Sequence, residues 1–125
     1  MLFTQKHPCS QCPFRKVSLP GWLGDTTPQE FIETTLADGL MPCHKTVDYE
    51  NPNWKFLMIF PDSEVQHCAG ARIFYRNQFK RSKNALVLIE EEEGRVVEVE
   101  KSDKVFKTAE EFIAHHNTQF HRRGK

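Results

Sequence analysis

Four cysteines constrain this chain more than any other feature, and all of them lie within its first 68 residues. Cys9 and Cys12 form a Cys-x-x-Cys turn, whereas Cys43 and Cys68 stand alone. The short turn directs two sulfurs the same way, so both can bind one ion, and two more thiolates complete a tetrahedral set. We therefore predict a single metal centre on all four cysteines.

The identity of the metal is open at this point. Structural zinc is the commoner occupant of such sites in small proteins, so Zn²⁺ is the favoured cofactor. A zinc ribbon, however, usually presents two Cys-x-x-Cys turns, and this chain has one. Isolated cysteines are tolerated at iron–sulfur sites, where four thiolates hold a [4Fe-4S] cluster, and this cluster is the alternative.

Two histidines stand beside cysteines, His44 after Cys43 and His67 before Cys68. Neighbouring residues point in different directions, so one ion rarely binds both members of such a pair. Either histidine is therefore an alternative metal ligand, or it donates a hydrogen bond to a ligating sulfur. The other histidines are expected to be solvated, and they are His7, His115, His116 and His121.

Four unrelated buried thiols are the plain alternative to a metal centre, because free cysteine is among the most buried residue types. Two disulfides are disfavoured. The N-terminus lacks a basic region followed by an apolar core, which predicts a reducing, cytoplasmic location. No segment approaches the ~18 apolar residues that cross a membrane, so no membrane partner is expected.

The apolar pattern predicts an α+β fold in one metal-binding domain over residues 1–125. Prolines and glycines break the first 27 residues, which predicts a loop that the cysteines must fix. Thr27 with Glu30 and Thr108 with Glu111 predict capping boxes at the starts of two helices. The other predicted elements are a buried strand over Trp54–Phe60, a helix over residues 66–81, and a β-hairpin with strands Ala85–Ile89 and Arg95–Val99. The cysteines thus occupy residues 1–83, and the hairpin and last helix occupy residues 84–125.

The predicted helix over residues 66–81 carries a row of basic side chains. Arg72, Arg76 and Lys80 follow one another at i+4 spacing, and Arg81 and Lys83 extend the row. A cationic helix anchored by a metal ligand can lie against phosphates, which predicts contact with nucleic acid. A solvated helix face is the opposing interpretation, because 17 Lys and Arg residues balance 17 Asp and Glu residues.

No catalytic motif in the chain is complete. Pro8-Cys9-Ser10-Gln11-Cys12 matches half of the zinc deaminase signature, but the residues before it contain no glutamate. A glycine-rich phosphate loop and a serine elbow are both missing, and no small-molecule substrate is evident. We predict a binding or regulatory module for nucleic acid or a protein rather than an enzyme. A redox-sensing or enzymatic iron–sulfur protein is the alternative.

Three motifs together resemble an uncharacterised family of small phage and bacterial proteins. They are Cys-Ser-Gln-Cys-Pro-Phe-Arg at 9–15, Met-Pro-Cys-His at 41–44 and His-Cys-Ala-Gly-Ala at 67–71. The resemblance covers the cysteine-bearing half of the chain and implies that the four cysteines act together. It also implies a phage or its host as the source. A phage-encoded protein is expected to work in the host cytoplasm, where nucleic acid or a host protein is the expected partner. The family has no assigned activity to carry over.

Overall fold

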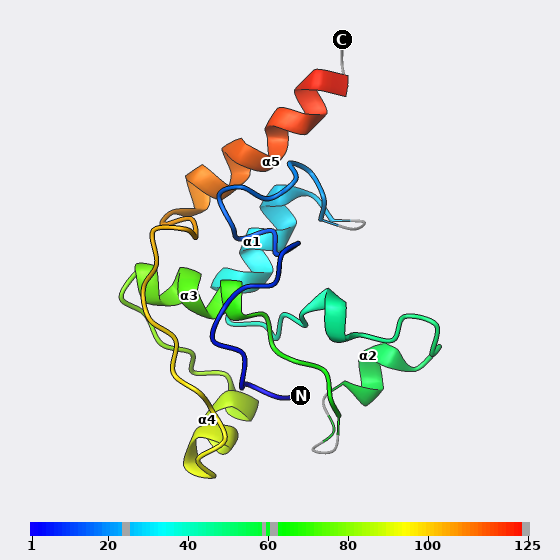
Figure 1. Ribbon diagram of the computed structural model, residues 1–125, viewed down its shortest axis with the longest axis vertical. Helices are drawn as coiled ribbons and strands as arrows, with labels where there is room; N and C mark the ends of the chain where they lie inside the picture. Colours follow the sequence, from blue (N-terminus) through cyan, green and yellow to red (C-terminus); the bar gives the residue numbers. More distant parts are fainter. Residues whose placement is uncertain (24–25, 59, 61–62, 124–125) are drawn as a thin grey trace.

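The computed structural model describes residues 1–23, 26–58, 60 and 63–123, and the side chains of 118–123 lie outside the description. In these residues five α-helices and one 3-10 turn are joined by long loops, with α4 and α5 at opposite ends and α2 projecting to one side (Figure 1). Within the described ranges there are no strands, only four isolated β-bridges. The elements are α1 (Pro28–Leu36), η1 (His44–Thr46), α2 (Trp54–Leu57), α3 (Ala69–Asn77), α4 (Ala85–Glu92) and α5 (Ala109–Arg123).

The predicted α+β fold with a β-hairpin is wrong. The first predicted hairpin strand, Ala85–Ile89, lies inside α4. Asn84 caps the start of this helix, and its side chain accepts a hydrogen bond from the Leu86 N–H at 3.0 Å. Glu90, Glu91 and Glu92 lie between the two predicted strands and continue this helix, because glutamate is a good helix former. Arg95–Val99 is extended but forms only an isolated bridge, from Val96 to Phe3.

Two further predicted elements differ from the structure. The strand predicted over Trp54–Phe60 is a single helical turn, α2, and Phe56 within it is 63% exposed. Ile59 lies outside the described residues. The helix predicted over residues 66–81 is shorter: α3 begins after Cys68, and it has ended before Phe79, which has a φ of 59°.

Both predicted capping boxes are confirmed. The Thr27 side chain accepts a hydrogen bond from the Glu30 N–H at 3.1 Å, and Thr108 accepts one from the Glu111 N–H at 3.1 Å. These bonds satisfy N–H groups that have no partner within the helix, and so fix where α1 and α5 begin. At the other end of α1, Asp38 takes the left-handed conformation that glycine usually supplies at a helix end, with a φ of 64°.

A cluster of phenylalanines forms the core between α1, α3 and α5. Phe14 is fully buried, and its ring centroid lies 5.6 Å from that of Phe31, 5.6 Å from that of Phe74 and 5.3 Å from that of Phe112. Each helix therefore contributes one ring, and the loop that carries Cys12 contributes the central one. The motif Cys-Pro-Phe thus ties the cysteine turn to the core.

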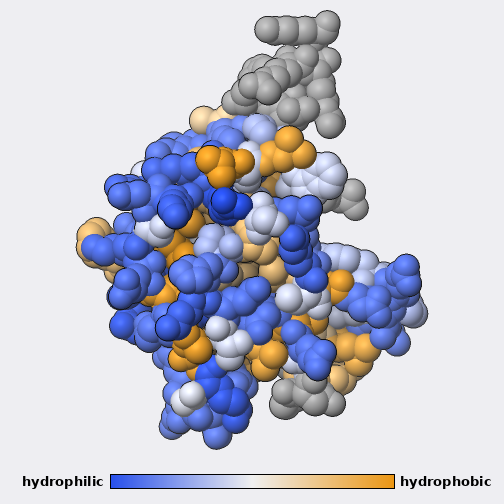
Figure 2. Space-filling view, in the orientation of Figure 1, coloured by the Kyte–Doolittle hydropathy of each residue, from blue (hydrophilic) through white to orange (hydrophobic). Residues whose placement is uncertain are grey.

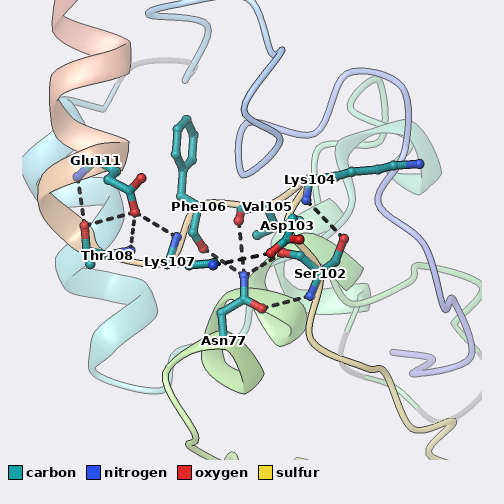
Figure 3. A network of polar contacts seen from close by, with 9 residues as sticks. All are labelled: Asn77, Ser102, Asp103, Lys104, Val105, Phe106, Lys107, Thr108 and Glu111. Carbon is teal, nitrogen blue, oxygen red and sulfur yellow. Dashed lines mark hydrogen bonds and ion pairs between the residues drawn. The ribbon is translucent and has the colours of Figure 1, made fainter.

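Asn77 at the end of α3 organises the approach to α5 (Figure 3). Its side-chain amide donates to the backbone carbonyls of Ser102, Val105 and Phe106 at 3.0–3.1 Å, and its carbonyl accepts from the Ser102 N–H at 2.9 Å. A loop with no regular hydrogen bonding needs such side-chain partners for its buried carbonyls. Asn77 supplies them from one position.

His116 of α5 fixes the N-terminal loop, contrary to the expected solvated position. The ring is 1% exposed; its Nε2 donates to the Pro13 carbonyl at 2.9 Å and its Nδ1 accepts from the Gly21 N–H at 3.0 Å. Burial lowers the pKa of His116 to about 4, so the ring is neutral at pH 7, as a ring that both donates and accepts must be. The side chain of His121 lies outside the described residues.

The face shown in Figure 2 is largely hydrophilic, with apolar side chains in separate places rather than in one continuous area. None of the helices in the described part of the chain has the length and apolar character needed to cross a membrane.

Candidate metal centre

All four cysteines line one cavity of about 490 Å³, which we call the cysteine cavity. They arrive from three segments: the turn with Cys9 and Cys12, the loop before η1 with Cys43, and the start of α3 with Cys68. Each of them is a free thiol in this structure. The predicted grouping of the four cysteines thus corresponds to a shared cavity.

Backbone hydrogen bonds join the segments that carry Cys43 and Cys68. The Cys43 N–H donates to the Gln66 carbonyl at 2.7 Å, and the Cys68 N–H donates to the Met41 carbonyl at 2.6 Å. Side chains tie the Cys9–Cys12 turn to η1, because Lys45 Nζ donates to Ser10 Oγ at 2.7 Å. The three segments therefore hold one another in place around the cavity.

The sulfurs of Cys12 and Cys68 lie 3.6 Å apart. Their approach depends on Gly70, since a Cβ atom at that position would lie 2.3 Å from Cys12 Sγ and 3.0 Å from Phe14 Cβ. Cys12 is itself only 1% exposed. A side chain of any size at position 70 would therefore push the Cys12 sulfur out of its place.

The contact between the two sulfurs shifts their pKa values in opposite directions. The hydrogen bond from the Cys12 thiol lowers the pKa of Cys68, and the N–H groups of Gly70 and Ala71 at the start of α3 act in the same direction. The same contact, together with burial, raises the pKa of Cys12. Of the two, Cys68 is therefore the thiol that loses its proton more easily, as a metal ligand must.

The remaining thiols are not yet in ligand positions. Burial raises the pKa of Cys43 to about 11, and the neighbouring thiols of Cys9 and Cys68 add to this effect. No group of three or more His, Cys, Asp or Glu side chains stands ready to hold a metal ion anywhere in the part of the chain that the structure describes. The preformed four-cysteine centre included in the predicted fold is therefore absent from those residues, and a shared cavity takes its place.

The two candidate histidines lie at different sites. His44 lines the cysteine cavity, and its Nε2 lies 3.3 Å from Gln11 Oε1. His67 instead stacks on Phe3, with 5.2 Å between the ring centroids, and lines a second pocket behind α3. Of the two, only His44 remains positioned as a possible ligand or hydrogen-bond donor to a sulfur.

Aromatic side chains form much of the remaining cavity wall, and the motif analysis did not include them. Trp22, Tyr49 and Trp54 all line the cavity, and the rings of Tyr49 and Trp54 meet edge to face with 4.9 Å between centroids. Trp22 is 64% exposed and Tyr49 52% exposed, so both rings lie near the opening. Nothing in their sequence spacing links them to the cysteines, because loops bring them there.

The row of basic residues does not form the open stripe that was predicted. Arg72 is turned inward: its guanidinium donates to the carbonyls of Phe3, Gln5 and Val97. Arg81 forms an ion pair with Glu98 at 3.2 Å, and Lys83 is exposed on the loop before α4. Arg72, Arg76, Lys80 and Arg81 line the second pocket together with His67, and we call it the basic pocket.

Comparisons with protein family models, with curated proteins and with solved structures find no match to this chain. The resemblance to small phage and bacterial proteins therefore stays a prediction that rests on the three motifs.

Proposed function

We propose that this protein binds a metal centre through Cys9, Cys12, Cys43 and Cys68 and that this centre is an iron–sulfur cluster. The observation that carries the proposal is the shared cysteine cavity of about 490 Å³. A water molecule needs roughly 10–15 Å³ of such space, so the cavity is far larger than one ion requires. A cluster held by four thiolates makes better use of that volume.

The cavity also suits a centre that is inserted after the chain folds. The four thiols are free, three of them are buried, and none of the described distances joins them as a disulfide. Backbone hydrogen bonds hold the segments of Cys43 and Cys68 together, and a ligand would need only side-chain movement of the thiols. When bound, the cluster would supply one-electron chemistry, and its potential would follow from the burial of the thiolates and their hydrogen bonds.

Structural zinc is the second candidate, and one distance favours it. Two sulfurs on the same tetrahedral zinc, each at about 2.3 Å from the metal, lie about 3.8 Å apart. Cys12 and Cys68 are already 3.6 Å apart. In this case Cys9 and Cys43 would close onto an ion held by that pair, and much of the cavity would remain open.

For biological role we propose a binding or regulatory module, with nucleic acid or a host protein as partner. Exposed aromatic side chains that line the cavity, Trp22 and Tyr49, support a contact surface there, since aromatic residues are enriched at interfaces. The basic row supports the nucleic-acid choice less than its spacing did, because Arg72 and Arg81 already have partners.

The test is the metal and sulfide content of the full chain, purified without oxygen, together with its visible spectrum. Iron with equal sulfide and a broad visible absorption is expected, and Cys68→Ser should abolish both. His67→Gln is the matched control, because His67 adjoins Cys68 but lines the other pocket, and it should keep the metal. One zinc per chain would select the second candidate, and four titratable thiols without metal would refute both.

A further inference from the structure

The basic pocket is a second site, separate from the cysteines, and it is built from parts of the chain far apart in sequence. Its lining comes from the end of α1, from α3, from α4 and from the extended segment at 96–99. The loop after α3 contributes Lys80 and Arg81. Its volume of about 60 Å³ equals roughly four to six water molecules, at about 10–15 Å³ for each. The pocket therefore has room for a small polyatomic ion or one group of a larger molecule.

Two of its four cations already have partners. Arg72 donates to three backbone carbonyls, and the charges of Glu98 and Glu91 act on it. Arg81 pairs directly with Glu98. These two arginines are part of the wall, and they balance the glutamates that face the pocket.

The other two cations form no ion pair among the described residues. Arg76 has a buried Nε with no hydrogen-bond partner, and within the described chain no carboxylate lies in ion-pair range of Arg76 or Lys80. The third acidic residue of the pocket, Asp38, is bound to neutral groups, since it accepts from Ser82 Oγ at 2.6 Å and from the Lys83 N–H. It forms no ion pair with Arg76 or Lys80 in the described chain, and its charge offsets part of theirs.

A buried polar atom from the opposite wall also lacks a partner. His67 is 7% exposed, and its Nδ1 makes no hydrogen bond within the described part of the chain. Native proteins seldom leave such a group unsatisfied without a water, an ion or a ligand in place, because its lost hydration is not replaced. His67 and Arg76, from different segments, thus line the same small pocket, and each has a buried nitrogen without a hydrogen-bond partner in the described chain.

We propose that the basic pocket binds a phosphate group, held by Arg76 and Lys80 with a hydrogen bond to His67. A phosphate group offers three strong acceptor oxygens, enough for Arg76, Lys80 and His67 together, whereas a carboxylate offers two. The volume admits the phosphate and excludes the rest of a nucleotide or sugar. Any further part of the ligand therefore lies outside the mouth of the pocket.

The test is a titration of the full chain with inorganic phosphate at constant ionic strength, followed by the backbone amide NMR signals. Saturable shifts are expected at residues around the pocket, such as 76–82 and 35–39. Arg76→Gln and Lys80→Gln should each weaken binding at least about tenfold, because a charge-assisted hydrogen bond is lost. Lys104→Gln is the control, since it removes one exposed charge outside the pocket and should leave the affinity unchanged.

The proposal is overturned if phosphate gives no saturable shift, if Lys104→Gln weakens binding as much as Lys80→Gln, or if acetate binds as well as phosphate. Lys80 is exposed, so its substitution should not unfold the chain, and it decides the matter even if Arg76→Gln proves unstable. A simple phosphate monoester in a parallel titration separates the two sources. Binding at least as tight as that of phosphate indicates a phosphorylated small molecule, and weaker binding indicates the free ion.

Discussion

The cysteine cavity and the basic pocket take consecutive residues from the chain just before α3, Cys68 for one and His67 for the other, yet they are built in opposite ways. The cavity is large, loops and residues of α1, α2 and α3 form its walls, and its thiols are free. The pocket is small, and hydrogen bonds and ion pairs already fix half of its cations. The cavity therefore has room for a group larger than a single ion, whereas the pocket has room for a small group beside the cations that have no ion-pair partner in the described chain.

This difference teaches what a residue type can and cannot say. A thiol in a reducing environment has few structural partners, so four thiols in one cavity point to a ligand. An arginine has five N–H donors and can be used up entirely by the protein itself. Arg72 and Arg76 share the same row, but one holds the fold together and the other has a buried, unpartnered atom.

The largest effect is expected from Arg72. Replacing it with leucine would leave the carbonyls of Phe3, Gln5 and Val97 without this donor, and we expect a loss of about 2–4 kcal/mol in the free energy of unfolding. Urea unfolding of the two proteins measures it. A loss under about 0.5 kcal/mol, typical of a solvated surface residue, would mean that Arg72 is free in solution to act with the rest of the basic row. It would contradict the structural role given to Arg72.

Gly70→Ala tests the cavity in the same way. The new Cβ atom would meet Cys12 Sγ at 2.3 Å and Phe14 Cβ at 3.0 Å, so we expect a loss of about 1–3 kcal/mol from overpacking and a displaced Cys12 thiol. Urea unfolding reports the first effect, and loss of bound metal reports the second. Gly94→Ala is the control. The new Cβ atom would meet no atom within 4 Å, but alanine is strained at the φ of 72° that Gly94 has. This variant should therefore be less stable than the wild type and still retain metal. Full metal retention in Gly70→Ala would show that the position of Cys12 does not matter.

The sequence predicted local features better than it predicted the fold. The capping boxes of α1 and α5 depend on residues three positions apart, so the sequence contains all the information that they need. The segment Ala85–Ile89 was misread because a short apolar run fits a strand and a helix equally well. The cap at Asn84 and the glutamates Glu90, Glu91 and Glu92 favour the helix.

The candidate site was predictable in its thiols and not in its surroundings. The Cys-x-x-Cys turn and two further cysteines predicted a shared location, and the cavity unites them. Trp22 and Tyr49 reach the same cavity through loops, and His116 fixes the loop of Cys9 and Cys12 from the far end of the sequence. Such long-range contacts depend on tertiary packing, which local patterns do not encode.

A smaller, pH-dependent effect should come from His116. Its pKa is about 4 in the folded protein and about 6.5 when unfolded, so the unfolded chain binds the extra proton between these values. Stability should therefore fall as the pH drops from 6.5 towards 4, by up to about 1.4 kcal/mol per pH unit, and the loss from this group should level off below pH 4. His67, with a pKa also about 4, adds a similar slope.

Urea unfolding at pH 7, 6 and 5 measures this slope, and His116→Gln should reduce it by about one proton. If His116→Gln retains the wild-type slope, the ring is not held neutral in the folded protein. The contact between α5 and the loop of the cysteine cavity would then be weaker than its hydrogen bonds indicate.

The smallest effect is expected for Arg81, and it completes the comparison along the basic row. Its ion pair with Glu98 joins two side chains that are each 61% exposed, and such pairs contribute under about 1 kcal/mol. Arg81→Gln should therefore change the urea midpoint little, and that small change should shrink further in high salt. A loss in the free energy of unfolding as large as that for Arg72→Leu would mean that Arg81 stabilises the fold as much as Arg72 does. A small loss places the structural role at Arg72 and leaves Arg76 and Lys80 as the cations of the row without a partner in the described chain.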